Sequence, residues 1–342
     1  MTATKITILL LIFLCTVVLC GGAYTAENPL AYHAFGDSIT AGFYAGAPNQ
    51  YVNVIQAEKH LEPLANRAIP AQLSCDMADT QIFPYELSAQ SGNPVYTEMI
   101  GTNDAISKGV GAYENNYNAC LKAALSWLGV PSTKKTFATA CRPSGTWSAD
   151  NAYGAGIGLI AAMKGASLSC TITTTGGPIY AWYRMADVNG GTFSYSVDGG
   201  PKTTINTTPS PPINTQKGGM HGENVIRITG LPASSHKILF TTANENPVSI
   251  GAIGTPGERS CCRILTGGVM YQQNDQDTAA TAAYNKDAQD DVALLKKDGL
   301  DIVFVDVRHY VNATSDMIDL LHPNDTGHRH LADAFEAMWE RH

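Results

Sequence analysis

Three short apolar runs constrain the fold of this chain more than any other feature. They cover residues 31–35, 95–100 and 302–307, and the first two end in a glycine, Gly36 and Gly101. The Ile-Val-Phe-Val sequence of the third run is typical of a central parallel strand that is covered on both faces. The runs therefore predict buried strands of one parallel sheet.

Amphipathic patterns separate and follow these runs. Apolar residues recur at helical spacing over 117–128, 284–295 and 331–338, and Gly129 and Pro131 end the first pattern. Strands that alternate with helices predict a parallel sheet with right-handed crossovers. The expected fold class is therefore α/β.

The segment from about 165 to 256 has little helical rhythm and is rich in Thr, Ser, Gly and Pro. Phe193, Tyr195 and Val197 alternate with polar residues, as a half-buried strand does. Similar runs, separated by turn residues, occur at 169–175, 179–185, 224–231, 236–242 and 247–253. We expect an antiparallel β-sandwich inserted at a surface loop of the α/β domain, where an insertion costs little stability.

The N-terminus is typical of a signal peptide. Lys5 precedes an apolar run over 6–19 that is too short for a comfortable membrane span, and small residues follow it. We expect cleavage after Ala23 or Ala26, a secreted or periplasmic protein, and no stable membrane span after cleavage. A lipoprotein anchored through Cys20 is the alternative, which the bulky leucine before it disfavours.

Six cysteines follow the expected cleavage site, and an even number in an exported chain predicts disulfides. Six cysteines allow 15 pairings, and the sequence does not choose among them, although two adjacent cysteines are expected to have different partners. A metal site would need thiolates or imidazoles at short spacing, such as Cys-x-x-Cys, which does not occur. The six are Cys75, Cys120, Cys141, Cys170, Cys261 and Cys262.

The charge and the glycine pattern exclude other classes of function. A net charge of -8 makes this chain a poor candidate for binding the phosphate backbone of nucleic acids. The first strand is not followed by a phosphate loop or by Gly-x-Gly-x-x-Gly. We therefore expect no nucleotide or flavin cofactor and no nucleic-acid partner.

Ser38 is the candidate nucleophile. It lies in Gly-Asp-Ser directly after the first strand, on a turn expected to lead into a helix whose N-terminus would favour developing negative charge. An ordinary helix cap is the alternative for such a serine.

His322 and Asp319 lie near the other end, in Asp-Leu-Leu-His-Pro-Asn. A serine hydroxyl needs an adjacent base, and a neutral imidazole, with an ordinary pKa of about 6.5, suits that role. An aspartate three residues away can hold the imidazole in the right tautomer from the same loop. The alternative is a surface histidine before a proline. We expect His328 and His330 to belong to the last helix and not to a metal site.

Asn103 lies in Gly-Thr-Asn-Asp after the second strand. An amide at the carboxyl end of a strand can donate a hydrogen bond to an oxyanion. The alternative is a plain turn, which these residue types form readily.

Together, Gly-Asp-Ser, Gly-x-Asn-Asp and Asp-x-x-His-Pro-Asn, in that order, resemble the motifs of the GDSL/SGNH hydrolase family. The resemblance covers about 31–150 and 263–342. It implies a flavodoxin-like three-layer α/β/α fold, with Ser38 as nucleophile, His322 as base and Asp319 as its orienting residue. It also implies an oxyanion hole formed by Asn103 and the backbone N–H of Ser38.

The sequence departs from the family at a fourth motif, where a glycine offers its N–H to the oxyanion. The corresponding position here is Ala71, which falls 33 residues after Ser38 and 32 before Asn103. A backbone donor does not need glycine, but it needs a φ angle that alanine tolerates. The alternative is that Ala71 is an ordinary loop residue.

The β-rich insert loosely resembles the jelly-roll modules that accompany some carbohydrate esterases, in the segments 193–200 and 230–238. Tyr180, Trp182 and Tyr183 are candidates for stacking on sugar rings, with core packing as the alternative.

The chain is thus expected to comprise a signal peptide (1–26), a hydrolase domain in two parts (27–160 and 261–342) and the inserted sandwich (161–260). The resemblance implies a serine esterase that acts through an acyl-enzyme, without cofactor or metal. Export and the insert favour removal of short acyl groups, such as acetyl, from a polysaccharide. The alternatives are a lipase, lysophospholipase or arylesterase acting on longer or aromatic acyl esters, and a non-catalytic glycan-binding protein.

Overall fold

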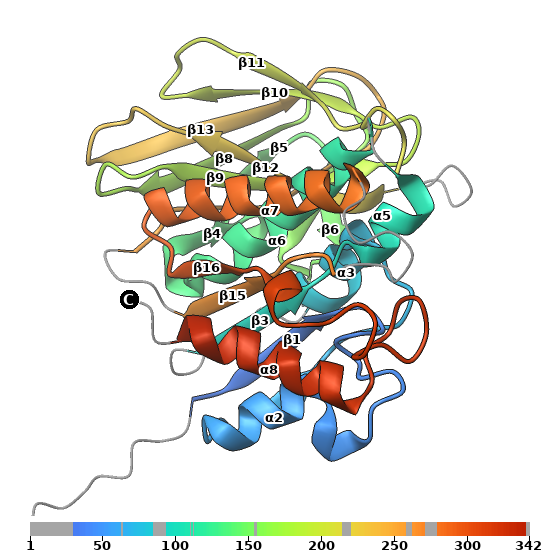
Figure 1. Cartoon of the computed structure of the whole chain (residues 1–342). Coiled ribbons are helices and arrows are strands. Elements are labelled where there is room, and N and C mark those ends of the chain that lie inside the picture. The colour runs from blue at the N-terminus through green and yellow to red at the C-terminus, as the bar shows by residue number, and fades with distance from the viewer. Residues whose placement is uncertain are drawn as a thin grey trace, which may run out of the picture.

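The computed structural model describes residues 30–62, 64–84, 94–109, 111, 113–153, 156–213, 220–257, 262–270 and 279–339. A parallel α/β unit and an antiparallel β-sandwich lie side by side (Figure 1). The expected signal peptide and Cys261 lie outside the described residues.

The parallel sheet has five strands in the order β16-β15-β3-β1-β2. Numbered from the other edge, this is the 2-1-3-4-5 order of flavodoxin-like folds. The expected strands at 31–35, 95–100 and 302–307 are confirmed as the first, third and fifth in chain order, whereas two others were not expected. The prediction that the 302–307 run is a central strand is wrong, because β16 pairs only with β15 among the described strands and lies at an edge of the sheet. The strands are β1 (Tyr32–Gly36), β2 (Leu64–Asn66), β3 (Val95–Met99), β15 (Arg263–Gly267) and β16 (Ile302–Val305).

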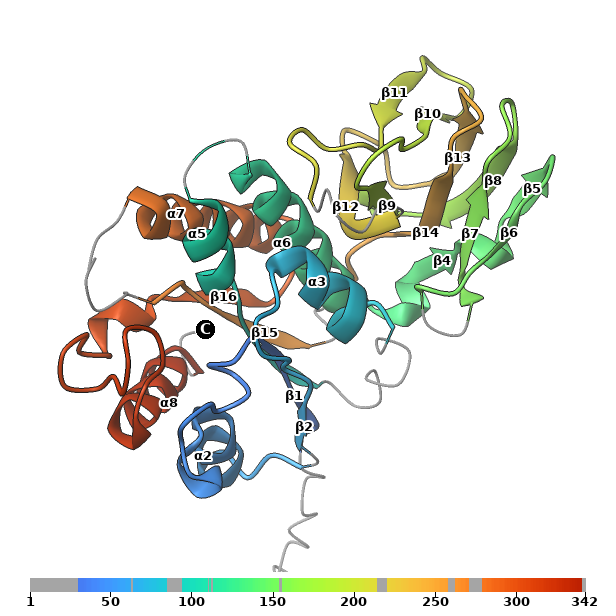
Figure 2. The same ribbon diagram turned by 90° about the vertical axis from the view of Figure 1, so that its right-hand side faces the viewer.

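Helices cover both faces of this sheet (Figure 2). On one face, α6 (Glu114–Gly129) and α7 (Ala279–Lys297) share a buried core with Tyr96, Ile264 and Ile302. On the other face, α2 (Tyr51–Glu58) and α8 (Asp325–Trp339) pack on Tyr32, Leu265 and Val305. Because strand side chains alternate between faces, neighbouring residues such as Ile264 and Leu265 serve opposite layers. The expected α/β/α arrangement of layers is confirmed.

The remaining helical segments are short. They are η1 (Ala47–Asn49), α3 (Ser74–Met77), η2 (Ala78–Ile82), α5 (Thr102–Lys108), η3 (Ser132–Lys134), η4 (Ala138–Ala140) and η6 (Val307–His309).

The sandwich consists of two antiparallel sheets whose inner faces share one apolar core. Tyr183 and Phe193, on opposite sheets, meet edge to face with ring centroids 5.4 Å apart. One sheet has the order β11 (Thr203–Asn206), β10 (Thr192–Val197), β13 (Ser235–Thr242), β8 (Ser167–Thr173) and β5 (Arg142–Ser144). The other has the order β12 (Met220–Ile228), β9 (Ile179–Ala186), β14 (Val248–Gly254), β7 (Gly158–Ala161) and β6 (Ser148–Asp150), with β4 (Lys135–Phe137) also paired to β14. The antiparallel pairing thus begins at Lys135, earlier than the expected boundary at 161.

Two disulfides join elements of these units, as the even cysteine count predicts. Cys75–Cys120 ties α3 to α6, and Cys141–Cys170 ties the segment before β5 to β8. Cys262 is buried at the start of β15.

The sandwich rests on α6 through the face of the sheet that contains β9 and β12 (Figure 2). Trp182 of β9 lies edge to face with Trp127 of α6, with ring centroids 5.1 Å apart, and its Nε1 donates to Ser126 Oγ at 2.9 Å. Tyr180 and Trp182 are fully buried here, and Tyr183 lies inside the sandwich core. The hypothesis that these three rings stack on sugars is therefore wrong, because α6 and the opposite sheet cover them.

Candidate active site

The site begins where β1 and β3 end. In a sheet of this order, the crevice between these two neighbouring strands is the switch point, because the chain leaves them toward opposite faces. Ser38 follows β1 and Asn103 follows β3. Gly36 has φ 152°, and a Cβ there would lie 2.3 Å from the carbonyl oxygen of Met99. Glycine is therefore required at position 36 for the turn that carries Ser38 to pass so close to β3.

The chain after Ser38 forms successive turns over 37–45, and the expected helix is not there. Ala41 N donates to Asp37 O at 2.9 Å and Phe43 N donates to Ser38 O at 3.0 Å. Helix α2 begins only at Tyr51, because two glycines and a proline between 42 and 48 interrupt helical backbone. The prediction of a helix N-terminus beneath Ser38 is wrong.

Ser38, His322 and Asp319 form one hydrogen-bonded chain. Ser38 Oγ lies 2.9 Å from His322 Nε2, and His322 Nδ1 lies 2.9 Å from Asp319 Oδ2. An ionised carboxylate only accepts hydrogen bonds, so it fixes the ring proton on Nδ1 and leaves Nε2 as the acceptor for the serine hydroxyl. This arrangement can draw the proton from the hydroxyl as the oxygen attacks an electrophile.

A tight turn holds Asp319 against the histidine that it orients. Its Oδ1 accepts from the backbone N–H of Leu321 at 2.7 Å and of His322 at 2.6 Å, as in an Asx turn. Partial burial acts to raise the pKa of Asp319, but the hydrogen bonds from the His322 side chain and the two amides outweigh it and lower the pKa. The Asp319 side chain is 40% exposed and that of His322 is 13% exposed. The carboxylate therefore stays charged and partly hydrated.

Two hydrogen-bond acceptors orient the side-chain amide of Asn103. Its Nδ2 donates to Asp37 Oδ2 at 3.3 Å and to the Gln72 carbonyl at 3.1 Å. Burial raises the pKa of Asp37 to about 7, partly offset by the N–H of Ile39. The 3.3 Å hydrogen bond from Asn103 Nδ2 to Asp37 Oδ2 is long, so an oxyanion in the site could compete with Asp37 for one hydrogen of the Asn103 amide.

Ala71 has the backbone conformation that favours glycine. Its φ is 62°, in the left-handed region that alanine rarely adopts. The next residue, Gln72, accepts the hydrogen bond from Asn103, so the Ala71 segment lies beside the amide. The structure therefore brings the family's glycine position next to Asn103, although the residue is alanine.

Two buried residues hold these segments together: Asp104, the last residue of the Gly-Thr-Asn-Asp motif, and Gln81, which belongs to none of the motifs. Gln81 Oε1 accepts from Gly36 N at 2.9 Å, while its Nε2 donates to Gly36 O at 2.7 Å and to Gln72 Oε1 at 2.6 Å. Asp104 accepts from Ser74 N at 3.0 Å and from Ser74 Oγ at 2.7 Å. Gln81 thus joins the nucleophile turn to the segment after Ala71. A buried glutamine within a polar stretch carries no sequence signal that would have identified it.

Two aromatic rings flank the histidine. The Phe43 ring centroid lies 5.1 Å from that of His322, and the Tyr44 centroid lies 5.4 Å away, edge to face. Both side chains are exposed.

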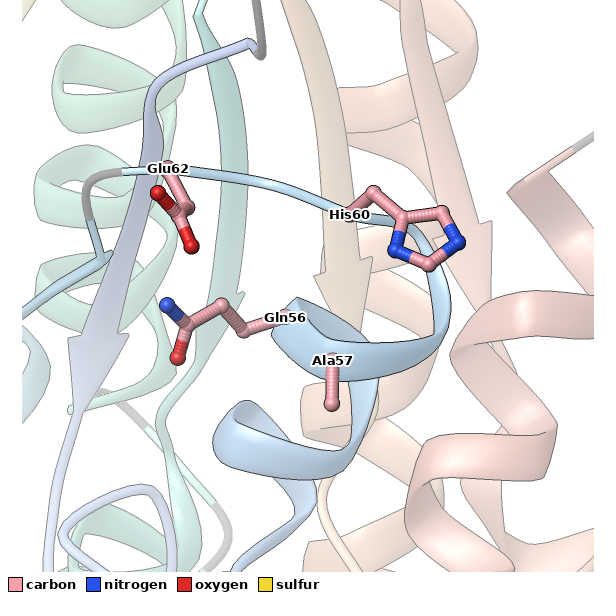
Figure 3. Close-up of a pocket in the computed structure, with 4 residues that line it drawn as sticks. All are labelled: Gln56, Ala57, His60 and Glu62. Carbon is pink, nitrogen blue, oxygen red and sulfur yellow. The ribbon is translucent and has the colours of Figure 1, made fainter.

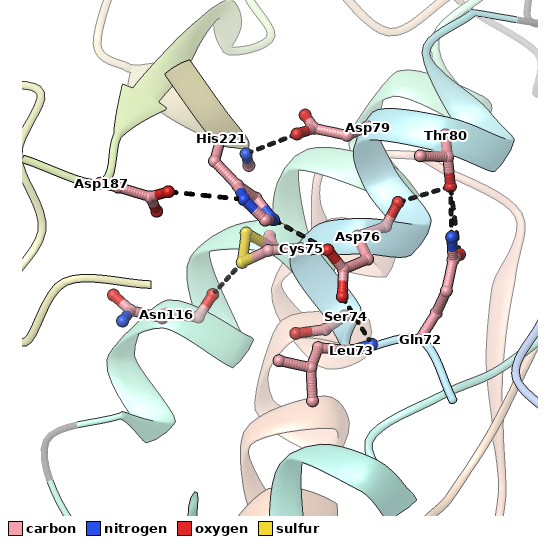
Figure 4. A network of polar contacts seen from close by, with 12 residues as sticks. Gln72, Leu73, Ser74, Cys75, Asp76, Asp79, Thr80, Asn116, Asp187 and His221 are labelled. Atoms are coloured by element: carbon pink, nitrogen blue, oxygen red, sulfur yellow. Dashed lines mark hydrogen bonds and ion pairs between the residues drawn. A yellow bond between two sulfur atoms is a disulfide. The ribbon is translucent and has the colours of Figure 1, made fainter. Parts of the chain in front are cut away.

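The sandwich contacts the α/β unit at α3, which begins two residues after Gln72 (Figure 4). His221 of β12 lies with Nε2 2.9 Å from Asp76 Oδ1, and Asp76 Oδ2 accepts from the N–H of Leu73 at 3.2 Å. Burial acts to lower the pKa of His221, but the carboxylates of Asp76 and Asp79 raise it above its ordinary value. The charged pair therefore links the sandwich to the start of α3.

His328 and His330 belong to α8, as expected. His328 is buried with its ring stacked 6.2 Å from Tyr51, and His330 Nδ1 lies 2.6 Å from Asp316 Oδ2. In the described ranges, no three His, Cys, Asp or Glu side chains are grouped so as to hold a metal ion. No helix in the described part of the chain is long and apolar enough to cross a membrane.

A hollow of about 460 Å³ lies at the other end of the sheet (Figure 3). Gln56, Ala57, His60 and Glu62 line it, where α2 ends and the chain turns toward β2. None of the candidate site residues lines this hollow.

No protein-family model and no curated protein matches this chain. Among solved structures, a member of the lipolytic protein G-D-S-L family from Veillonella parvula is 10% identical, with 92% of this chain and all of that chain covered at a TM-score of 0.42. A two-domain esterase active on acetylated mannans is 14% identical, with 66% of this chain and 90% of that chain covered at a TM-score of 0.34.

An exo-β-1,3-galactanase from Phanerochaete chrysosporium is 17% identical over 35% of this chain, at a TM-score of 0.28. This chain spans only 28% of the length of the galactanase. At such identities and TM-scores, functional inference depends on the site itself. The order of the three motifs Gly-Asp-Ser, Gly-x-Asn-Asp and Asp-x-x-His-Pro-Asn resembles that of the GDSL/SGNH hydrolase family.

Proposed function

We propose that this chain is a serine carboxylic-ester hydrolase. The observation that carries the proposal is the hydrogen-bonded chain from Ser38 Oγ through His322 to Asp319, with both links at 2.9 Å. Serine hydroxyls act as nucleophiles when a base oriented by a carboxylate accepts their proton.

The reaction would proceed in two steps. Ser38 Oγ attacks the ester carbonyl while His322 Nε2 takes its proton, and His322 then protonates the leaving alcohol to give an acyl-enzyme. Water repeats the sequence, which releases the acid and restores the serine. Charge on the carbonyl oxygen would be stabilised by the Asn103 amide and by the backbone N–H groups of Ser38 and Ala71.

For the substrate, we propose a short acyl group, such as acetyl, on an extracellular polysaccharide. The signal peptide expected at 1–26 and the two disulfides support a protein that works outside the cytoplasm. The competing activity is hydrolysis of longer or aromatic acyl esters by a lipase, lysophospholipase or arylesterase.

The non-catalytic alternative rests on the absence of glycine at position 71. The left-handed backbone of Ala71, which is the conformation that favours glycine, weighs against this alternative. The hydrogen bonds that join Ser38, His322 and Asp319 also favour the catalytic hypothesis.

A panel of p-nitrophenyl esters from acetate to longer acyl chains tests both the esterase activity and the preference for a short acyl group. We expect turnover to be highest with acetate and to fall steadily with acyl length. An optimum at long chains would contradict the short-acyl substrate but leave the esterase intact. Absence of turnover across the whole panel would contradict the esterase.

A further inference from the structure

Exposed apolar side chains gather on the segments that carry the candidate site. Ten large hydrophobic residues of the described chain are exposed, and six of them lie within six residues of Ser38, Ala71, Asn103, Asp319 or His322. The six are Phe43, Tyr44, Ile69, Ile106, Ile318 and Leu320. Contiguous exposed apolar surface marks a place where something binds, so the members that contact one another and the site are the ones that matter.

Only Phe43 and Tyr44 of this set have ring contacts with a proposed catalytic side chain. They are 44% and 57% exposed, and their centroids lie 4.7 Å apart, edge to face. Both rings also contact the imidazole of His322. Tyr44 therefore presents much of its ring to solvent immediately beside the base.

The loop that carries the two rings is held in place. Phe43 N donates to Ser38 O at 3.0 Å, and Asp325 at the start of α8 accepts from Gly46 N at 3.1 Å and from Asn49 Nδ2 at 2.8 Å. Tyr44 has φ 67°, a left-handed conformation that is strained for a bulky residue. Strained backbone that is fixed by its surroundings is concentrated at functional sites.

The position of the rings indicates which part of an ester they would face. In the proposed reaction, His322 Nε2 gives its proton to the leaving alcohol, so groups around His322 lie on the alcohol side. The oxyanion donors at Asn103 and Ala71 belong to the carbonyl side. The rings therefore flank the alcohol and not the developing oxyanion.

We propose that Phe43 and Tyr44 form a leaving-group subsite, in which Tyr44 stacks on the pyranose ring that bears the ester. The inference rests on the proposed esterase activity and names the alcohol that it prefers. An aromatic face carries partial negative charge and attracts the partly positive C–H face of a sugar ring.

The test compares two acetyl esters that differ only in the alcohol: an O-acetylated methyl pyranoside and methyl acetate, which has no ring. We measure kcat/KM for both in the wild type, Tyr44→Phe and Tyr44→Gly. Glycine removes the ring but accepts the left-handed φ, so it keeps the loop conformation. Leu30→Ala, which removes an exposed apolar side chain at the other end of β1, is the control.

We expect Tyr44→Gly to lower the ratio of pyranoside to methyl acetate efficiency by about three- to tenfold, mainly through KM, as stacking energies of this size imply. Tyr44→Phe should keep the ratio and Leu30→Ala should leave both efficiencies unchanged. Equal losses on both esters would overturn the subsite, because Tyr44 would then only position His322. An unchanged ratio would also overturn it.

Ser38→Ala separates this inference from the proposal beneath it. If Ser38→Ala still hydrolyses methyl acetate, the esterase assignment fails, whatever Tyr44 does. If Ser38→Ala is inactive and the Tyr44→Gly ratio is unchanged, the esterase stands and the sugar subsite fails. As a further check, unacetylated methyl pyranoside should inhibit wild-type hydrolysis of methyl acetate competitively, and inhibit Tyr44→Gly more weakly.

Discussion

Ser38 Oγ lies 2.9 Å from His322 Nε2, although 284 positions separate the two residues. The sheet explains this proximity. Ser38 follows the carboxyl end of β1, while His322 lies in the segment between β16 and α8. Helix α8 packs on the same face of the sheet as α2. The sandwich lies between β1 and α8 in sequence but to one side of both elements in space (Figure 2).

Asp319→Asn should slow catalysis by preventing the correct tautomer of His322. Loss of a buried triad aspartate costs about 10⁴ in kcat. We expect a smaller loss here, between about tenfold and 10³-fold, because Asp319 is 40% exposed and water can replace part of its role. The measurement is kcat for p-nitrophenyl acetate, with Asp333→Asn on the outer side of α8 as the matched control. A kcat within twofold of the wild type would exclude Asp319 as the orienting residue.

Asn103→Ala should remove one oxyanion donor. We expect kcat to fall by about 10²–10³ with little change in KM, because the donor acts on the charge that develops in the transition state. Steady-state kinetics with p-nitrophenyl acetate measure both constants. A change confined to KM would show that Asn103 binds the ground state only.

Ala71→Gly should relieve backbone strain. Left-handed backbone costs a non-glycine residue about 1–2 kcal/mol, whereas glycine loses about 0.5–1 kcal/mol in chain entropy. We therefore expect a gain in the free energy of unfolding of up to about 1.5 kcal/mol, with activity retained. Ala68→Gly, at a position without positive φ, should destabilise the protein. Chemical denaturation checks both variants, and destabilisation by Ala71→Gly would contradict the assigned conformation.

The buried carboxyl groups predict that stability rises as the pH falls from about 8 to about 6. Burial raises the pKa of Asp37 to about 7 and that of Asp104 to about 6, the latter partly offset by hydrogen bonds from Ser74. Across this range the folded state takes up protons that the unfolded state does not, so protonation stabilises the fold.

His33 and His328 act in the opposite direction below about pH 7, because burial lowers the pKa of each to about 4 while the unfolded imidazoles take up protons at about pH 6.5. Burial also raises the pKa of Glu336 to about 7 and that of Asp291 to about 6, so the carboxyl groups together outweigh the two histidines between pH 8 and pH 6.

Thermal denaturation at pH 6 and pH 8 measures this dependence. We expect a higher Tm at pH 6, and a smaller difference between the two values in Asp37→Asn, which cannot titrate. A wild-type Tm that is equal or higher at pH 8 would contradict the assigned burial of these carboxyl groups.

The sequence predicted the elements whose pattern is long or strongly apolar. The stripes of α6, α7 and α8 and the runs of β1, β3 and β16 were each expected close to where they lie. The resemblance of the three motifs to those of the GDSL/SGNH family implied that their residues serve one site, and the structure brings Ser38, Asp319 and His322 into one hydrogen-bonded chain. Two strands of the parallel sheet were not predicted. Strand β2 has only three residues, and β15 follows a Cys-Cys pair that did not suggest a strand.

Other features depend on packing that no local pattern contains. Trp182 and Tyr180 lie on one face of β9, and the sequence does not tell whether that face is exposed to solvent or covered by another element. The packing of α6 on this face buries both rings. The φ of Ala71 and the role of Gln81 arise from contacts between segments far apart in the sequence. The turn after Ser38 differs from the expected helix because glycine and proline follow too closely for a helix to begin.

The central claim is that Ser38 is the nucleophile of an ester hydrolase. The most direct measurement is turnover of p-nitrophenyl acetate by Ser38→Ala, with Ser144→Ala, an exposed serine of β5, as the control. We expect Ser38→Ala to lose at least about 10³-fold in kcat while its thermal unfolding stays like that of the wild type, and Ser144→Ala to keep full activity. Unchanged turnover in a folded Ser38→Ala variant would contradict the assignment.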